Sequence, residues 1–287
     1  MTSTSESQPR SAEAVRRAAV VTHGKPGTIG PALERLEKVA REAGVDLLMP
    51  GEEVEKHGVG EPEQDLESAD IAVVLGGDGT MLRALHRFLG GGVPVIGVNF
   101  GRVGFFASIR PAELESALAR VFAGDYRVVE LTTLETATDS VRAPAINDVV
   151  ALSAVRGRMV ELGWAIGGED LGVQPCDGMI CSTPSGSTAY NLSNGGPVVV
   201  RGVDAIALTF IAAHSLHVRP LVVPRGLEVE IRNETPDVDA SVIVDGHATA
   251  ELGHGESVVV RLGEQSALLA TLPETTFFSR YRETFGS

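Results

Sequence analysis

The order of apolar segments in the first 125 residues constrains the fold more than any other feature of this 287-residue chain. Short apolar runs typical of buried strands alternate there with amphipathic segments of helical periodicity. The expected strands are "AAVVTHG" (18–24), "VDLLMP" (45–50), "DIAVVLGG" (70–77) and "VPVIGVN" (93–99), and the expected helices span 28–43, 79–89 and 111–124. This alternation predicts a parallel, Rossmann-like α/β sheet with right-handed crossovers.

The rest of the chain has a different sequence pattern. Between residues 126 and 270, short Val- and Thr-rich runs are separated by Gly, Pro, Asn and Asp, which is typical of an antiparallel, β-sandwich-like domain. We therefore expect an α/β domain over 18–125 and a β-rich domain over 126–270. Residues 1–17 are polar and are expected to form a disordered tail. The aromatic segment 271–287 is expected to pack back on the α/β domain.

The charge of the chain excludes several classes of partner. The net charge is −14 and the isoelectric point is about 4.9, so nucleic acid and anionic membrane surfaces would repel the protein. No apolar run approaches the roughly 20 residues of a membrane-spanning helix, and the N-terminal segment has no apolar core of a secretion signal. Cys176 and Cys181 lack CxxC spacing and are expected to be reduced thiols of a cytoplasmic protein.

Lysine is absent from most of the chain. The lysines are Lys25, Lys38 and Lys56, and every later basic residue other than histidine is an arginine. This distribution excludes the phosphate-binding lysine of a P-loop and a lysine Schiff base anywhere after residue 56. A phosphate-binding site formed by residues after 56 must therefore use arginine, backbone N–H groups or a metal ion.

The stretch "VVLGGDGTML" (73–82) ends an expected buried strand and opens an expected helix. We expect Gly76, Gly77, Gly79 and Thr80 to bind phosphate, because glycines permit close approach and a helix N-terminus attracts anions. Asp78 has two interpretations. It could cap the helix, or it could hold Mg²⁺ or accept a proton from an attacking hydroxyl group during phosphoryl transfer.

Three clusters downstream carry further polar groups. "IND" (146–148) pairs an amide with a carboxylate. "DGMICSTPSGSTAYNLSNGGP" (177–197) is dense in hydroxyls, amides and glycine, which suit the sugar and base of a nucleotide, and Tyr190 could stack on a ring. "AHSLHVRP" (213–220) holds two histidines without an identifiable third ligand, so no metal-ligating residue is expected.

In order along the chain, these motifs resemble those of the NAD kinases, enzymes that phosphorylate NAD to NADP. The resemblance rests on "GGDGT" (76–80), "VIGVNFGRVGFF" (95–106), "ND" (147–148), the 177–197 stretch, "HSLHVRPLVVP" (214–224) and "VDGH" (244–247). "GGDGT" alone also occurs in lipid kinases and phosphofructokinases. "GGDGT" followed by "GSTAY" is highly specific for the NAD kinases.

The resemblance implies a role for each matching residue. Asp78 is implied as the catalytic base for the 2′-hydroxyl of the adenosine ribose, and His247 stands where glutamine is common. The implied NAD-binding residues are Asp78, Gly79, Arg83, Asn147, Asp148, Arg158, Asp177, Thr188, Ala189, Tyr190, Asn191, Leu192, Ser193 and His247. The resemblance also implies ATP, or another nucleotide or polyphosphate, as the phosphoryl donor, Mg²⁺ as the metal, and a homodimer or homotetramer.

Two other functions fit parts of the sequence. A "GGDGT" lipid kinase would share Asp78, but an acidic chain without a basic amphipathic helix suits a lipid substrate poorly. A non-catalytic sensor of NAD or NADP would share the "GSTAY" loop but would have no need of Asp78. An assay with NAD, ATP and Mg²⁺ separates these functions.

Overall fold

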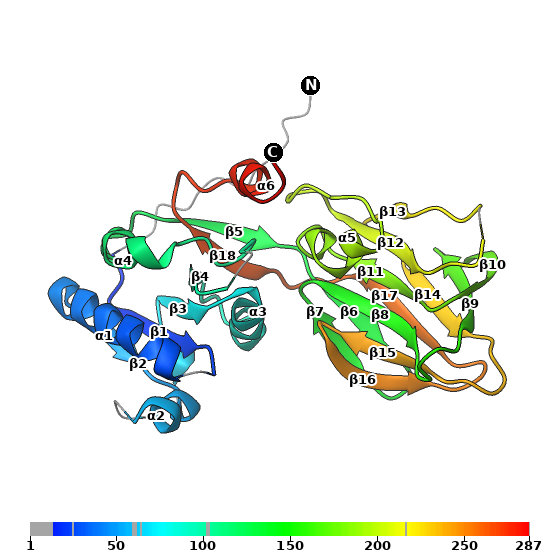
Figure 1. Cartoon of the computed structure of the whole chain (residues 1–287), viewed down its shortest axis with the longest axis horizontal. Coiled ribbons are helices and arrows are strands. Elements are labelled where there is room, and N and C mark those ends of the chain that lie inside the picture. The colour runs from blue at the N-terminus through cyan, green and yellow to red at the C-terminus, as the bar shows by residue number, and fades with distance from the viewer. Residues whose placement is uncertain are drawn as a thin grey trace. The chain divides into compact units, whose positions relative to one another are not determined.

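The chain divides into two compact units. One holds the residues up to Glu130 and those from Ala267 onward, and the other spans Leu131–Ser266 (Figure 1). The computed structural model describes residues 14–24, 26–58, 62–63, 65–101, 104–215 and 217–286. Most of the expected N-terminal tail therefore lies outside the described residues. Within that tail, Val15 is buried and a strand begins at Arg17.

The first unit is built on a largely parallel sheet. In its described part the strand order is β2 (Asp46–Leu48), β1 (Arg17–Thr22), β3 (Ile71–Gly76), β4 (Val95–Asn99), β18 (Ala267–Thr271) and β5 (Arg127–Leu131). Neighbouring strands from β2 to β18 run parallel. Every residue of β3 is buried, as expected for a strand covered on both faces. The α/β prediction is confirmed.

Helices cover both faces of this sheet. Their bounds are α1 (Pro26–Ala43), α2 (Gly51–His57), α3 (Asp78–Arg87), α4 (Leu114–Phe122) and α6 (Phe277–Phe285), with 3₁₀ turns at Leu66–Ser68 and Pro111–Glu113. Ile96 and Val98 share a core with α1 and α4. Side chains alternate along a strand, so Gly97 faces the other way, and a Cβ there would collide with Met81 of α3.

The domain boundaries expected from sequence would assign two strands of this sheet to the β-rich domain. Strands β5 and β18 lie beside each other in the α/β unit, although residues 126–270 were expected to belong to the β-rich domain. A short Val- and Leu-rich run has the same local pattern in either kind of sheet. Only strand pairing across more than 130 residues assigns it, and no local pattern records such pairing.

The C-terminal helix α6 contacts a loop of the same unit. Arg280 donates a hydrogen bond to the carbonyl oxygen of Gly104, and the rings of Phe285 and Phe105 have centroids 5.7 Å apart. A capping box between Thr276 and Ser279 starts the helix. These contacts place α6 beside residues 104 and 105 of the α/β unit.

The second unit consists of two antiparallel sheets. One has the strand order β10 (Glu169–Cys176), β9 (Val160–Ile166), β14 (Val229–Asn233), β17 (Ser257–Leu262), β6 (Leu134–Ala137) and β7 (Arg142–Ala145). The other has the order β13 (Leu221–Pro224), β12 (Ala205–Ile211), β11 (Gly178–Ser182), β8 (Asp148–Ser153), β15 (Ala240–Val244) and β16 (His247–Leu252). A 3₁₀ turn, η3 (Gly186–Thr188), and a short helix, α5 (Tyr190–Ser193), follow β11.

One apolar core joins the two sheets of this unit. Alternate residues of β14, β15 and β17 are buried, which is the pattern of sheets with one face inward. Trp164 of one sheet meets Phe210 of the other edge to face, with centroids 5.3 Å apart. The β-sandwich-like prediction is confirmed.

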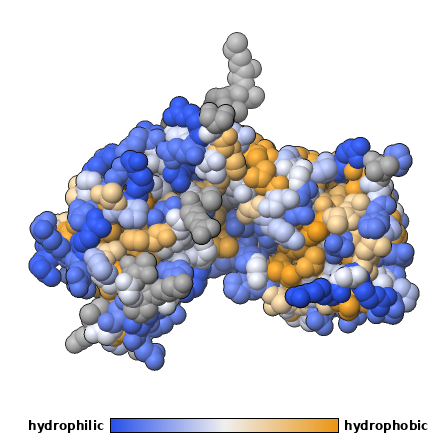
Figure 2. Space-filling model, in the orientation of Figure 1, coloured by the Kyte–Doolittle hydropathy of each residue, from blue (hydrophilic) through white to orange (hydrophobic). Residues whose placement is uncertain are grey.

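On the face shown in Figure 2, hydrophilic residues cover much of the surface, and apolar areas are visible on the β-rich unit. Exposed apolar side chains occur on the edge strands of its sheets, at Leu171 and Val173 of β10 and at Leu221 and Val222 of β13. Among the described residues, no helix has both the length and the apolar character needed to span a membrane.

Candidate active site

A pocket of about 630 Å³ lies at the carboxyl ends of β1, β3 and β4 in the α/β unit. Adjacent parallel strands end at one edge of a sheet, which is where α/β proteins bind ligands. The pocket is lined by His23, Gly24, Ile29, Gly76, Gly77, Gly79, Thr80, Arg83, Phe100 and Gly101. The structure therefore brings the four expected phosphate-binding residues together with Arg83.

Asp78 is held by three backbone N–H groups from one loop. Oδ2 accepts the N–H of Phe105 at 2.8 Å, and Oδ1 accepts those of Phe106 and Ala107 at 3.0 and 3.1 Å. Helix α3 begins at Asp78 with Gly77 as its N-cap, and no side chain caps it. The helix-cap interpretation of Asp78 is therefore wrong. The carboxylate is oriented by a segment 27 to 29 residues away in sequence.

The start of α3 offers unpaired N–H groups to the pocket. The N–H groups of Asp78 and Gly79 have no acceptor among the described residues. Apart from its chain neighbours and the backbone of its own helix, no described atom lies within 4 Å of a Cβ built on Gly79, so this position leaves room for a ligand. Gly76 has a different reason to be glycine, because a Cβ there would lie 2.5 Å from Oγ1 of Thr80. Gly79 thus leaves room for a ligand, whereas Gly76 is required by its packing against Thr80.

Arg83 lies one helical turn beyond the "GGDGT" stretch and lines the same pocket. Its Nη2 donates to the carbonyl oxygen of Thr22 at 2.7 Å, and its side chain is 51% exposed. The pocket therefore has a fixed guanidinium group on its wall. Together with the start of α3, this positive charge makes the pocket suitable for a phosphate chain.

In the β-rich unit, the Asp245 carboxylate is hydrogen-bonded to the backbone of the "IND" motif. Its carboxylate accepts the N–H groups of Ile146, Asn147 and Asp148 at 2.7, 2.8 and 2.9 Å. In return, Asp245 donates its own N–H to the carbonyl oxygen of Asp148 at 3.0 Å. The "IND" and "VDGH" motifs, almost 100 residues apart, therefore form one structural cluster.

Asp148 is buried next to Asp245. Burial and the neighbouring negative charge raise the pKa of Asp148 from 3.8 to about 7. Because the folded protein keeps a proton that the unfolded chain releases, the free energy of unfolding falls as pH rises from about 4 to about 7.

Asp148→Asn is expected to remove this pH dependence, because the amide does not ionise. The variant should be more stable than the wild-type chain at pH 8, by up to about 4 kcal/mol, with no such gain at pH 4. Chemical denaturation of both proteins across this pH range measures the difference. Parallel pH profiles for the two proteins would contradict the expectation.

The loop after β11 folds against the Asn147 backbone. A Cβ on Gly186 would collide with the Asn147 carbonyl oxygen, and the Thr183 hydroxyl donates to the carbonyl oxygen of Ile146 at 2.7 Å. Thr188, Ala189, Leu192 and Ser193 retain partial or full exposure, and Tyr190 is 42% exposed. These residues therefore remain accessible beside the Asn147 backbone.

Asn191 differs from its neighbours. Its side chain is 0% exposed, its amide group donates to the carbonyl oxygens of Ser187 and Pro197, and its Oδ1 accepts the Thr209 hydroxyl at 2.6 Å. We expected Asn191 to contact NAD, but its side chain is buried and fully hydrogen-bonded. These hydrogen bonds fix the conformation of the loop instead.

Arg158 and Asp177 do not join this cluster within the chain. Asp177 precedes β11 and Thr183 follows it, so the two lie at opposite ends of the strand, about 20 Å apart. Arg158 lies at the Asp177 end and pairs with Asp237 at 2.9 Å. His247 does lie near the cluster, with its Nδ1 3.1 Å from the carbonyl oxygen of Asp245.

Sequence reasoning missed three parts of these sites. Asp245 had a usable signal, because an Asp-Gly pair between strands predicts a tight turn, and its φ of 47° bears this out. The N–H groups of residues 105–107 have no side-chain signal. Glu53, whose Oε1 lies 3.5 Å from Nη2 of the pocket residue Arg83, stands in the ordinary polar stretch "GEEVEK", where nothing marks it as buried.

Comparison with known proteins agrees with both parts of the structure. The ATP-NAD kinase N-terminal domain family matches residues 32–126, and the ATP-NAD kinase C-terminal domain family matches residues 146–272. An NAD kinase of Heliobacterium modesticaldum is 41% identical over 223 residues, which cover 76% of this chain and 79% of the relative. One from Bifidobacterium longum is 34% identical over 281 residues, which cover 95% of this chain and 82% of the relative.

Solved structures share the fold. An Archaeoglobus fulgidus NAD kinase in complex with ATP superposes with a TM-score of 0.74 and 26% identity, covering 94% of this chain and 97% of that one. Yeast NADH kinase complexed with NADH gives a TM-score of 0.83 at 24% identity, covering 96% and 88%, and this likeness concerns the fold alone. The family matches and the identity to these relatives lead to one conclusion: the chain belongs to the NAD kinase family.

Proposed function

We propose that this chain is an NAD kinase that transfers a phosphoryl group from ATP to the 2′-hydroxyl of the adenosine ribose of NAD, forming NADP. The observation that supports this most directly is Asp78, a carboxylate fixed by three backbone N–H groups and placed in the chain between Gly77 and Gly79, which both line the pocket. A lipid kinase and a non-catalytic sensor are disfavoured by the matches to both NAD kinase domain families, over residues 32–126 and 146–272.

In the proposed mechanism the pocket binds the phosphate chain of ATP. The free N–H groups at the start of α3 bind phosphate oxygens. The resemblance implies Arg83 for NAD, but because its guanidinium group lines this pocket we assign it instead to the phosphate oxygens of ATP. Oδ2 of Asp78, which accepts one backbone N–H, orients the ribose hydroxyl and takes its proton as that oxygen attacks the γ-phosphorus in line. The backbone bonds fix the carboxylate, so little orientation is lost in reaching the reactive geometry.

The β-rich unit is proposed to bind the NAD molecule. Asn147 and Asp148, held by Asp245, supply polar groups for the dinucleotide. The backbone and exposed side chains of residues 188–193 contact its sugars and base, with Tyr190 as a stacking surface. His247 stands at the edge of the same cluster and offers a ring nitrogen where glutamine is common in the family.

A divalent metal ion would depend on the substrate for most of its ligands. Mg²⁺ is usually held by one or two carboxylates together with substrate phosphates and water. Within the described residues, no group of three His, Cys, Asp or Glu side chains is arranged as a metal site, and Asp78 offers a carboxylate between the pocket-lining residues Gly77 and Gly79. The described residues thus fit an ion that arrives with ATP, to which Mg²⁺ would supply charge neutralisation of the phosphates.

Oligomerisation would explain the separation of Arg158 and Asp177 from the other NAD-binding residues. We propose a homodimer or homotetramer in which a second copy brings these two side chains to the dinucleotide. Light scattering of the purified protein measures its mass. A strictly monomeric protein with full activity would contradict the arrangement.

The proposed function is tested by incubating the purified chain with NAD, ATP and Mg²⁺ and measuring NADP with an NADP-specific dehydrogenase. We expect NADP to accumulate in proportion to enzyme and ADP to form in equal amount. Parallel reactions replace ATP by polyphosphate or NAD by NADH, which establishes donor and acceptor preference. ATP consumption with diacylglycerol but not with NAD would favour a lipid kinase, and binding of NAD without turnover would favour a sensor.

A further inference from the structure

Glu53 is a buried carboxylate on α2 that the sequence did not single out, and its exposed fraction is 0%. Its Oε1 accepts the N–H of Thr22 at 3.0 Å, and its Oε2 accepts the Thr22 hydroxyl at 2.5 Å and the Lys56 ammonium at 2.8 Å. Burial by itself raises the pKa of Glu53, but the hydrogen bonds from Lys56 and Thr22 outweigh burial and hold the pKa below its ordinary value. Glu53 is therefore ionised inside the α/β unit.

His57 of α2 also contacts Thr22. Its Nε2 lies 2.7 Å from the Thr22 hydroxyl oxygen, and its side chain is 3% exposed. Because an ionised carboxylate can only accept, we assign the Thr22 hydroxyl hydrogen to Oε2 of Glu53, the shorter of its contacts, and Nε2 of His57 as a donor to the hydroxyl oxygen. Thr22, at the carboxyl end of β1, is thereby held from two sides by α2.

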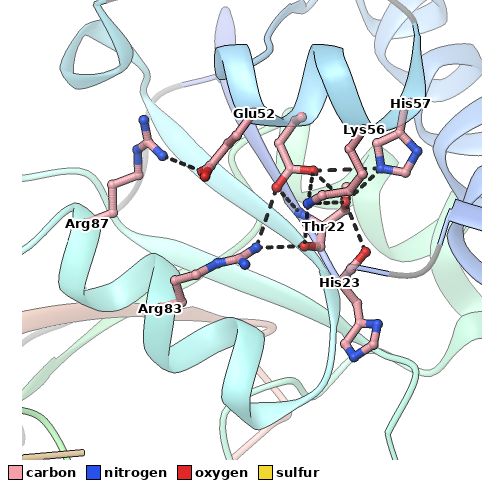
Figure 3. A network of polar contacts seen from close by, with 8 residues as sticks. Thr22, His23, Glu52, Lys56, His57, Arg83 and Arg87 are labelled. Atoms are coloured by element: carbon pink, nitrogen blue, oxygen red, sulfur yellow. Dashed lines mark hydrogen bonds and ion pairs between the residues drawn. The ribbon is translucent and has the colours of Figure 1, made fainter. Parts of the chain in front are cut away.

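The network reaches the pocket through Arg83 of α3. Nη2 of Arg83 donates to the Thr22 carbonyl oxygen and lies 3.5 Å from Oε1 of Glu53 (Figure 3). These contacts use one nitrogen of the guanidinium group. Three further N–H groups, on Nη1 and Nε, are left for a ligand on the pocket side.

We propose that Glu53 is a positioning residue for the phosphoryl donor: it fixes Thr22 and thereby holds the Arg83 guanidinium group at the wall of the phosphate pocket. This inference rests on the proposed function, because it assumes that the pocket receives ATP. The physical reason is preorganisation. A free arginine side chain loses rotational freedom when it binds phosphate, and a guanidinium group already anchored at Nη2 loses less.

The test is Glu53→Gln, which keeps the size of the side chain and removes its charge. We expect the KM for ATP to rise about tenfold, equivalent to about 1.4 kcal/mol, while the KM for NAD and kcat stay within about twofold. Arg83→Met should raise the KM for ATP at least as much. The double variant should be no worse than Arg83→Met alone, because Glu53 acts through that side chain.

Glu52→Gln is the matched control on the same helix. Glu52 pairs with Arg87 of α3 at 2.8 Å, but both side chains are exposed and neither lines the pocket. We expect its KM for ATP to equal that of the wild-type chain. If Glu53→Gln lowers only the folded fraction and kcat, with both KM values unchanged, Glu53 is merely structural and the proposal is overturned.

Two further measurements keep the proposal testable. If Glu53→Gln does not fold, Thr22→Val removes the hydroxyl group and keeps the carbonyl oxygen that Arg83 contacts, and its KM for ATP should rise about threefold. An unchanged value overturns the proposal. Calorimetric binding of an ATP analogue with a non-transferable γ-phosphate separates this inference from the proposed function. Weaker binding by Glu53→Gln supports it even if no NADP forms, and equal binding by both proteins overturns it.

Discussion

Replacement of Asp78 by Asn is expected to lower the rate of NADP formation by about 10³-fold or more while NAD still binds. The amide cannot accept the proton of the ribose hydroxyl. Its NH₂ group would also face one of the backbone N–H groups of residues 105–107, so the side chain would lose part of its orientation. Single-turnover formation of NADP measures the chemical step, and calorimetry measures NAD affinity.

Asp70→Asn is the matched control for this experiment. Asp70 also accepts two backbone N–H groups, from Arg16 and Arg17 at 2.7 and 2.9 Å, but it precedes β3 at the opposite edge of the sheet from the pocket. If weakening a carboxylate–backbone contact were enough to lower the rate of NADP formation, both Asp78→Asn and Asp70→Asn should show the loss. Near wild-type turnover by a folded Asp78→Asn protein would falsify the assignment of Asp78 as general base.

Removal of the Asp245 carboxylate should have the second large effect, on NAD binding and on stability together. Asp245→Ala leaves the N–H groups of Ile146, Asn147 and Asp148 without their acceptor in a buried position. Each buried N–H group left unpaired costs about 1–3 kcal/mol, so the loss of all three bonds should lower the free energy of unfolding by about 3–9 kcal/mol. NAD affinity should drop at least about tenfold, because the "IND" backbone no longer has a fixed conformation.

Two companion variants separate the causes. Asp245 has a φ of 47°, which alanine adopts poorly, so Asp245→Gly removes the carboxylate without that backbone strain. Asp245→Asn keeps one acceptor oxygen and should lie between the wild-type chain and the glycine variant. Denaturation curves and calorimetric NAD binding of the three proteins give the comparison. Wild-type NAD affinity in a folded Asp245→Gly protein would show that the carboxylate does not organise the binding site.

The sequence predicted the fold class and the elements around the phosphate pocket with small errors. The run that became β3 is continuous and apolar because helices cover both faces, and this pattern is visible without coordinates. The expected helix at 79–89 is α3 at Asp78–Arg87, and the one at 111–124 is a 3₁₀ turn followed by α4. Periodicity places such elements well because it depends on neighbouring residues alone.

The candidate site was predicted as a set of residues rather than as an arrangement. The "GGDGT" motif indicated both a phosphate site and a carboxylate, but composition could not choose between a helix cap and a catalytic role for Asp78. Asn191 matched the family motif as well as its exposed neighbours did, yet its side chain is fully used inside the loop. Burial of a polar side chain depends on residues far along the chain, and a motif does not report it.

By itself, the sequence determined the two kinds of domain, the absence of lysine beyond Lys56 and the family to which the chain belongs. Only the tertiary structure decided that the backbone of residues 105–107 orients Asp78, that Asp245 organises the "IND" motif and that Glu53 holds Arg83. The reason is physical. Helices and strands follow from side-chain periodicity over a few residues, whereas these hydrogen bonds join groups separated by about 30 to 100 residues. Many of the groups are backbone N–H groups, which every residue except proline possesses.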